Sequence, residues 1–355
     1  MTYAPGNTAP RMTSPEDGQS VMGELPEATA SKLPRWRGFN LHGLYTVDKE
    51  LHFQESDFEL MREWGFNFAR LPMDYRIWSE KEDPSKLLEE RLEAIDQALE
   101  WGRHYAIHVN LNFHRAPGHC VNWPPEPFNL WKEEEPLALS AQHWAMFARR
   151  YRGVPNRLLS FNLLNEPPWE LDEPAYARVI RRLTGAIRAE DPDRLIIVDG
   201  LRWGYDAVKS LVDLGVAQSL HAYEPIQLSH YKAEWFGTYM GADKWPEPTW
   251  PLTIDGVFWD RERLSQRVRD WQAIETQGVG IHIGEFGAYC REPHSVVLAW
   301  MKDWMELIQE AGWGWAIWDF RGSYGPLNSR RKDVAYEDFR DMKLDRKMLD
   351  LIRAF

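Results

Sequence analysis

The sequence predicts an α/β protein built as a single (β/α)8 barrel, and three observations lead to this prediction. The chain has 355 residues, which is long for an ordinary domain but normal for such a barrel with loop insertions. From residue 36 onward, short apolar runs alternate with longer amphipathic stretches, the pattern of strand–helix units around a parallel sheet. The sequence shows no internal repeat and no second domain, so one barrel accounts for the whole alternation.

Eight runs rich in apolar and aromatic residues are the predicted strands. They span residues 37–42, 67–71, 108–113, 158–163, 195–198, 219–222, 280–284 and 314–317. The amphipathic stretches between them are the predicted helices. In the clearest one, which starts near Pro174, five apolar residues share one face and predict packing on the barrel: Val179, Ile180, Leu183, Ala186 and Ile187.

Residues 1–33 differ in composition from the rest of the chain. They contain Pro, Gly, Ser and Thr but no apolar run of signal-peptide length, which predicts an extended N-terminal arm before a barrel domain at residues 34–355. We therefore expect a cytoplasmic location, or a secreted one if a signal peptide has been removed.

The overall composition excludes several classes of protein. Apolar residues make up 44% of the chain and charged residues 27%, as in globular proteins with a large core and unlike disordered or membrane-spanning chains. The net charge of −12 disfavours binding to nucleic acid or to an anionic membrane. The 19 tryptophans instead favour a neutral ligand with flat apolar faces, such as a sugar. The oligomeric state is open, and we assume a monomer.

Two predicted connections are much longer than those typical of strand–helix units, namely residues 115–135 after the third strand and 224–256 after the sixth. Both hold tryptophans, and long loops in compact domains are usually functional or disordered. We expect both loops to form walls of a cleft. Their tryptophans are Trp123 and Trp131 in the first loop and Trp235, Trp245 and Trp250 in the second.

The sequence gives no indication of a metal or redox cofactor. Its two cysteines, Cys120 and Cys290, are far apart and predict free thiols. His114, His119 and Cys120 lie close together, but they lack the spacing of a zinc site, so His119 and Cys120 are expected to line the cleft.

Two glutamates stand at the ends of apolar strands, where an unpaired carboxylate is costly and needs a reason. Glu166 follows the fourth predicted strand and Glu285 follows the seventh. In a barrel, the carboxyl ends of the strands surround the active site, so both side chains should enter one pocket. Most enzymes that cleave glycosidic bonds use a pair of carboxyl groups as their catalytic residues.

Other residues at strand ends complete a recognisable pattern. The motifs are Asn67-Phe68-Ala69-Arg70, Asn112-Phe113-His114, Asn165-Glu166-Pro167, His221-Ala222-Tyr223, Gly284-Glu285-Phe286 and Ala316-Ile317-Trp318. With these motifs in this order, the chain from about residue 37 onward resembles glycoside hydrolase family 5. This cellulase and mannanase family consists of retaining (β/α)8-barrel enzymes.

The resemblance implies a mechanism. Glu285 would be the nucleophile that forms a glycosyl-enzyme, while Glu166 would protonate the leaving oxygen and later activate water as a base. This double displacement retains the anomeric configuration and requires carboxyl groups about 5–5.5 Å apart.

The resemblance also assigns supporting roles. Arg70 and Tyr223 would bond the nucleophile, and Asn165 would bond the sugar 2-hydroxyl. His114 and His221 would complete the polar floor of the site. Trp318 would be the stacking platform, followed by a strained or cis peptide bond. Beyond the matched positions, further candidate substrate contacts are His42, Trp123 and Trp235.

The shared motifs leave the substrate open. The leading prediction is endoglucanase activity on β-linked glucan, with the β-glycan or an oligosaccharide as the partner and no cofactor. β-Mannanase and exo-acting β-glucosidase or glucanase activities use the same residues and stay as alternatives. A carbohydrate-binding protein without turnover is a further alternative, although such a protein needs neither carboxylate.

Overall fold

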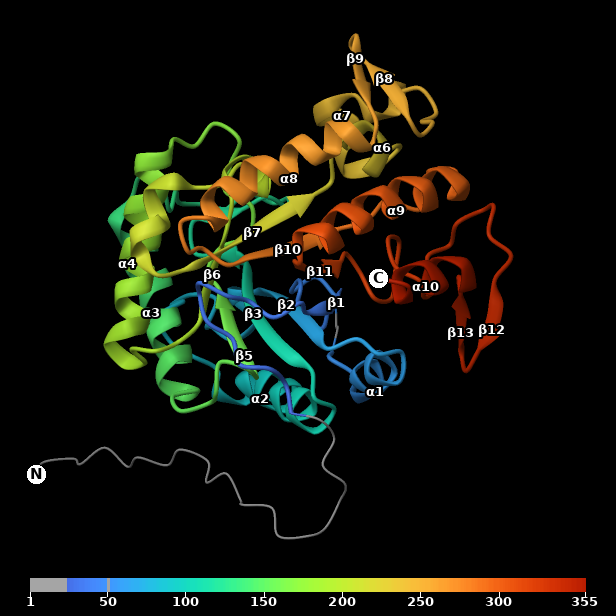
Figure 1. Ribbon diagram of the computed structural model, residues 1–355. Coiled ribbons are helices and arrows are strands. Elements are labelled where there is room, and N and C mark those ends of the chain that lie inside the picture. The colour runs from blue at the N-terminus through green and yellow to red at the C-terminus, as the bar shows by residue number, and fades with distance from the viewer. Residues whose placement is uncertain (1–23, 50–51) are drawn as a thin grey trace, which may run out of the picture.

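The computed structural model describes residues 24–49 and 52–355. Within these residues, eight parallel strands close a barrel surrounded by helices, as predicted (Figure 1). Each predicted strand region overlaps one barrel strand: β1 (Arg37–Asn40), β2 (Phe68–Asp74), β3 (His108–Ala116), β5 (Leu159–Asn162), β6 (Ile196–Asp199), β7 (Ala217–Ala222), β10 (Ile281–Phe286) and β11 (Gly314–Ile317). Each strand pairs with its neighbours in the chain order of the barrel, and β1 pairs with β11 to close the ring.

Helices form the outer layer. They are α1 (Glu55–Glu63), α2 (Glu89–His104), α3 (Glu134–Arg150), α4 (Glu173–Glu190), α8 (Arg261–Glu275), α9 (His294–Ala311) and α10 (Arg346–Arg353). Helix α4 has the predicted character, because Asp172 accepts the Ala175 amide at 2.7 Å to cap it and its apolar stripe faces the barrel. The connection from β6 to β7 differs, since only the short α5 (Leu201–Gly204) and the 3-10 helix η2 (Lys209–Leu214) occupy it.

Apolar side chains fill the space between the barrel and its helices. Several tryptophans are fully buried there, among them Trp144 on α3, Trp271 on α8, and Trp300 and Trp304 on α9. These tryptophans stabilise the core and are not available to a ligand.

Residues 24–33 lie across the end of the barrel at which the strands begin. Ala28 packs with Trp36 and Phe68, and the Ala30 carbonyl accepts the Gly280 amide at 2.7 Å. Of the predicted N-terminal arm, residues 1–23 lie outside the described residues, and residues 24–33 contact the barrel directly.

The two long connections form structure of their own. The first turns back into β4 (His119–Cys120), which pairs antiparallel with β3. The second stands at the top of Figure 1 and contains α6 (Ile226–Ser229), α7 (Glu234–Met240), η3 (Ala242–Lys244) and the hairpin of β8 (Leu252–Ile254) and β9 (Val257–Trp259). These elements are too short to leave a clear period in the sequence.

The remaining short elements are η1 (Tyr75–Ile77) after β2 and the hairpin of β12 (Glu337–Phe339) and β13 (Met342–Leu344) before α10. Among the helices that the structure describes, none combines the length and apolar character needed to cross a bilayer.

Candidate active site

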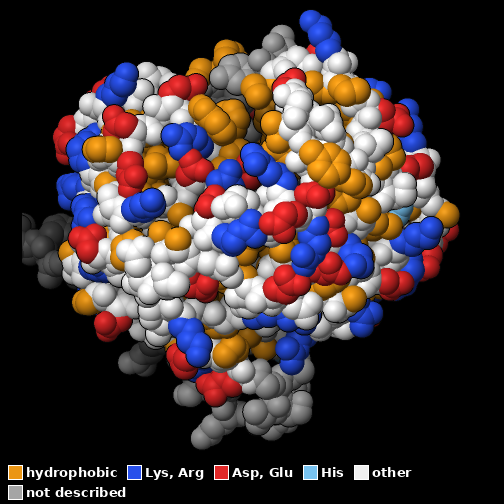
Figure 2. All heavy atoms as spheres, turned by 45° about the horizontal axis from the view of Figure 1, so that its top comes forward, with side chains coloured by type: hydrophobic (Ala, Val, Ile, Leu, Met, Phe, Trp, Pro, Cys, Tyr) orange, Lys and Arg blue, Asp and Glu red, His pale blue; other side chains and the backbone are white. Residues whose placement is uncertain are grey.

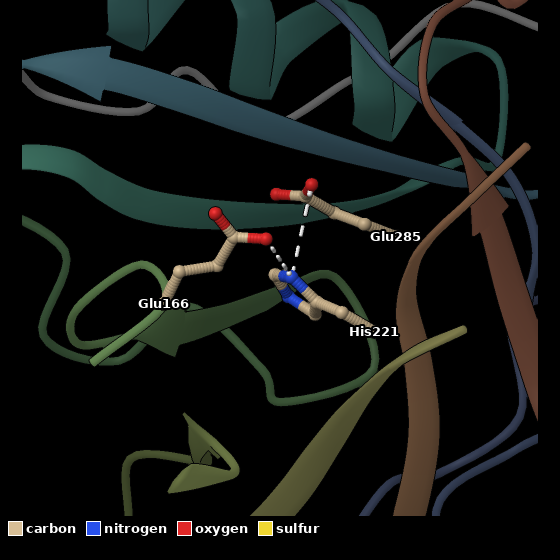
Figure 3. Close-up of side chains that lie close together, drawn as sticks. All are labelled: Glu166, His221 and Glu285. Atoms are coloured by element: carbon tan, nitrogen blue, oxygen red, sulfur yellow. Dashed lines mark hydrogen bonds and ion pairs between the residues drawn. The ribbon is translucent and has the colours of Figure 1, made fainter. Parts of the chain in front are cut away.

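Glu166 and Glu285 meet in one pocket at the carboxyl ends of the barrel strands. An oxygen of Glu166, an oxygen of Glu285 and a ring nitrogen of His221 all lie within 4.8 Å of one another. Figure 3 shows both carboxyl groups next to the imidazole ring of His221, which belongs to β7. This is the arrangement expected from the strand positions of the two glutamates.

A bulge in β10 places Glu285 in this pocket. The register of β10 against β7 shifts between Ile283 and Glu285, so that Glu285 stands opposite His221. A Cβ on the intervening Gly284 would lie 2.2 Å from the Ser219 hydroxyl, so the close approach of the two strands requires glycine.

Both oxygens of Glu285 have fixed partners. Arg70 Nη1 donates to Oε1 at 2.7 Å, and the Tyr223 hydroxyl donates to Oε2 at 3.0 Å. Burial raises the pKa of Glu285 to about 7, although the positive charges of His221 and Arg70 act in the opposite direction.

The Arg70 guanidinium is itself held on every side. It is buried and donates to three asparagine side chains in addition to Glu285. The acceptors are Asn162 at 2.9 Å, Asn40 at 2.9 Å and Asn165 at 2.8 Å. A planar group with this many partners has one orientation, which fixes Glu285 in turn.

Glu166 has an unusual backbone. Its φ of 44° lies in the left-handed region, which costs a non-glycine residue about 1–3 kcal/mol. The Glu166 amide donates to Asp199 Oδ2 at 3.1 Å, and this bond stabilises the strained conformation. The Glu166 side chain lies with Oε1 at 2.9 Å from His221 Nδ1 and Oε2 at 3.4 Å from Asn165 Nδ2.

His221 connects the two glutamates to a third carboxylate. Its Nδ1 lies 3.7 Å from Glu285, and its Nε2 lies 3.1 Å from Asp199. Burial disfavours a charged imidazole, but the carboxylates of Glu285 and Asp199 raise the pKa of His221 to about 10. His221 therefore lies between three carboxylates, with Glu166 and Glu285 near Nδ1 and Asp199 near Nε2.

An aromatic cluster with free polar atoms stands beside the carboxylates. The Trp318 ring stacks on His114 at 5.2 Å and lies 4.3 Å from the His42 ring. Burial lowers the pKa of His42 to about 3 and that of His114 well below its usual value, so both rings are neutral. His42 Nε2 and His114 Nδ1 are buried and have no hydrogen-bond partner among the described residues, which is unusual for polar atoms in a protein interior. The peptide bond between Trp318 and Asp319 is cis.

A comparison with protein families identifies a family of glycosyl hydrolases, in agreement with the carboxylate pair on the parallel barrel. The family described as Cellulase (glycosyl hydrolase family 5) matches residues 25–323. The chain belongs to glycosyl hydrolase family 5.

Proteins similar to this family 5 enzyme include glycoside hydrolases. A solved structure described as a glycoside hydrolase is 36% identical, with a TM-score of 0.85 over 90% of this chain and 99% of that chain. Endoglucanase C of Acetivibrio thermocellus is 26% identical over 330 residues, which cover 84% of this chain and 95% of the relative. Cel5A of Thermotoga maritima, solved in a mutant form with cellobiose, shares the fold at 21% identity and a TM-score of 0.73, over 90% of this chain and 96% of that chain.

Two of the residues proposed from sequence, Trp123 and Trp235, are largely exposed. Trp123 is 87% exposed, on a loop whose Asn122 donates to the Tyr45 hydroxyl at 2.6 Å. Trp235 is 54% exposed and packs edge-on against Tyr289 at 4.9 Å. Both side chains are free to meet a long ligand, but neither belongs to the cluster around Glu166 and Glu285.

Other residues of the long connections pack inward, contrary to the expectation that they line the cleft. Trp131 is buried with its ring 4.9 Å from that of His119, and Trp250 donates to Asp303 of α9 at 2.8 Å. The buried His119 bonds the Asn165 carbonyl at 2.7 Å and so supports the loop that carries Glu166. Cys120 and Cys290 are both free, as predicted.

Sequence reasoning missed Asp199, Asn40 and Asn162. Asp199 is fully buried at the end of β6 and contacts both Glu166 and His221, while the two asparagines hold Arg70. The signal for Asp199 was present, because this acidic residue closes an apolar strand in the same way as Glu166 and Glu285 do.

Proposed function

We propose that this family 5 enzyme cleaves β-linked glucan chains internally and retains the anomeric configuration. The separation of the two carboxylates is the main support, because an oxygen of Glu166 lies within 4.8 Å of an oxygen of Glu285. Inverting enzymes keep their carboxyl groups about 6.5–9.5 Å apart to make room for a water molecule. The shorter separation instead suits direct attack by one carboxylate on the sugar.

In this mechanism Glu285 attacks the anomeric carbon while Arg70 and Tyr223 hold its two oxygens. Glu166 donates its proton to the leaving oxygen, and the resulting carboxylate then takes a proton from the water that hydrolyses the glycosyl-enzyme. His221 orients the Glu166 side chain through the bond at 2.9 Å.

Asn165 suits contact with the sugar 2-hydroxyl. Its Oδ1 accepts from Arg70 Nη2 at 2.8 Å, so the amide orientation is fixed and Nδ2 is the atom that faces Glu166. This amide NH2 group can donate a hydrogen bond that strengthens as charge develops on the sugar.

The choice of glucan rests on the relatives named endoglucanase, and a product-resolved assay tests it. We expect hydrolysis of cello-oligosaccharides at internal bonds, with the β-anomer as the first product seen by NMR. Manno- and xyloglucan oligosaccharides complete the panel. Release of the α-anomer first would contradict retention. Faster cleavage of manno-oligosaccharides would show that mannan, and not glucan, is the preferred substrate. No hydrolysis of any β-glycan would favour a binding protein.

A further inference from the structure

A second aromatic site lies next to Glu166. It is a cavity of about 340 Å³ whose walls come from the loop after β5, the turn after β6 and the long connection after β7. Figure 2 shows hydrophobic side chains gathered around a hollow in the upper part of this face of the molecule. The aromatic residues that line the cavity are Trp169, Trp203, Tyr205 and Trp259.

The cavity adjoins the loop that carries the acid/base. Trp169 lies three residues after Glu166, and the Trp203 amide donates to the Pro167 carbonyl at 3.0 Å. The rings of Trp169 and Trp203 are 5.2 Å apart and form one wall. Because Glu166 protonates the departing oxygen, the group attached to that oxygen leaves on the Glu166 side. Trp318, the expected sugar platform, does not line this cavity.

Strained backbone holds Trp203 in place. Arg202 and Trp203 both have left-handed φ values, 52° and 59°, which non-glycine residues rarely adopt. Gly204 follows with φ 87°, and a Cβ at this position would lie 2.7 Å from the His221 ring. The turn therefore presents Trp203 to the cavity, while Gly204 packs against His221, the ring that bonds Glu166.

The lining of the cavity is mainly apolar, and its polar side chains are Glu170, Glu224 and Gln227. Glu224 lines it, but Arg267 donates to both Glu224 oxygens, at 2.7 and 2.8 Å. On the Trp318 side, in contrast, His42 and His114 keep buried ring nitrogens without a partner. A sugar ring needs many hydrogen bonds, whereas an apolar group needs only contact area, so this cavity fits an apolar occupant.

We propose that this cavity binds the hydrophobic part of an alkyl or aryl leaving group, so that the enzyme also cleaves β-glucan oligosaccharides linked to a hydrophobic alcohol. This inference rests on the proposed function, since Glu166 must protonate the glycosidic oxygen. The bond from the anomeric carbon to oxygen breaks, Glu166 supplies the proton of the released alcohol, and water later supplies the hydroxyl group of the sugar.

Hydrolysis of methyl, butyl and 2-phenylethyl β-cellobiosides tests the proposal, with cellotriose as a sugar-only substrate. The three alcohols are similarly weak acids, so the substrates differ mainly in the apolar area of the leaving group. We expect kcat/KM to rise in this order, by about tenfold or more from methyl to 2-phenylethyl, because the larger group is removed from water. Equal kcat/KM values would overturn the proposal while leaving the proposed function intact. No cleavage of any cellobioside or of cellotriose would overturn both.

Two neighbouring residues on β9 provide a matched pair of variants. Trp259 lines the cavity, whereas Phe258, the preceding residue, is 56% exposed and is not among the lining residues. Trp259→Ala should reduce the preference for 2-phenylethyl over methyl cellobioside, and Phe258→Ala should preserve it. Trp169 also lines the cavity and is 44% exposed, and it lies outside the β8–β9 hairpin. Trp169→Ala should therefore reduce the same preference without altering the hairpin. An unchanged preference in both tryptophan variants would overturn the proposal.

Discussion

Asp199 Oδ2 lies 3.1 Å from His221 Nε2. The same oxygen accepts the Glu166 amide at 3.1 Å, so one carboxylate supports both the backbone of Glu166 and the imidazole that bonds its side chain. Burial alone would raise the pKa of Asp199, but His221 and Arg70 lower it below its usual range, and the group stays ionised. Asp199 is therefore a positioning residue that acts through Glu166 and His221.

Replacing Asp199 by Asn should separate its charge from its hydrogen bond. Asn can still accept the Glu166 amide, but it no longer stabilises a charged imidazole, so the pKa of His221 should fall from about 10. We expect kcat/KM to fall by roughly 10- to 100-fold. NMR titration of the His221 ring checks the pKa, and Asp193→Asn on the exposed turn before β6 is the control. An unchanged His221 titration in Asp199→Asn would contradict the assignment.

Glu285→Ala should abolish turnover on every substrate, because no glycosyl-enzyme forms without the nucleophile. Hydrolysis of aryl β-cellobioside and of cello-oligosaccharides measures the loss. Added azide can occupy the vacated space and attack directly, which would give the inverted α-glycosyl azide. Wild-type activity in this variant would exclude Glu285 as the nucleophile.

Glu166→Ala should affect substrates unequally. An aryl leaving group of low pKa departs with little protonation, so glycosylation should largely survive and hydrolysis of the glycosyl-enzyme should become slow. Azide needs no general base and should restore turnover with the β-glycosyl azide as product. If this variant instead yields the α-azide, the roles of the two glutamates are reversed.

The pH dependence of kcat/KM should show an acidic limb near pH 7. The pKa of Glu285 is raised to about 7 in the free enzyme, and only the ionised carboxylate attacks the sugar. Activity should therefore fall about tenfold per unit as the pH drops further below this value. Initial rates at low substrate concentration, across pH 4 to 9, measure the limb. A limb at pH 4–5, the range of an ordinary glutamate, would show that Arg70 and His221 outweigh burial.

Two glycines should respond oppositely to alanine. A Cβ on Gly38 of β1 would lie 1.7 Å from the Phe68 carbonyl oxygen, so the strands would have to separate, and we expect a loss of more than about 3 kcal/mol in unfolding free energy. Gly185 on α4 has nothing within 4 Å of such a Cβ, so Gly185→Ala should add about 0.5–1 kcal/mol. Urea unfolding followed by tryptophan fluorescence measures both. A stable Gly38→Ala barrel would contradict the packing described for β1 and β2.

The barrel and its central carboxylates could be predicted from sequence because both depend on local signals. A buried parallel strand leaves an apolar run, and Glu166 and Glu285 each stand directly after such a run. Their meeting at one end of the barrel follows from the rule that parallel strands end on the same side.

Only the tertiary structure decided which other side chains share the site. Asp199 meets His221 because β6 and β7 are neighbours in the closed sheet, and nothing in the spacing of these residues shows that their side chains face each other. Tryptophans that look alike in sequence also differ, since Trp131 is buried whereas Trp123 is exposed. Hydrophobicity gives both the same tendency to leave water, but the packing of distant segments determines whether a partner surface is present.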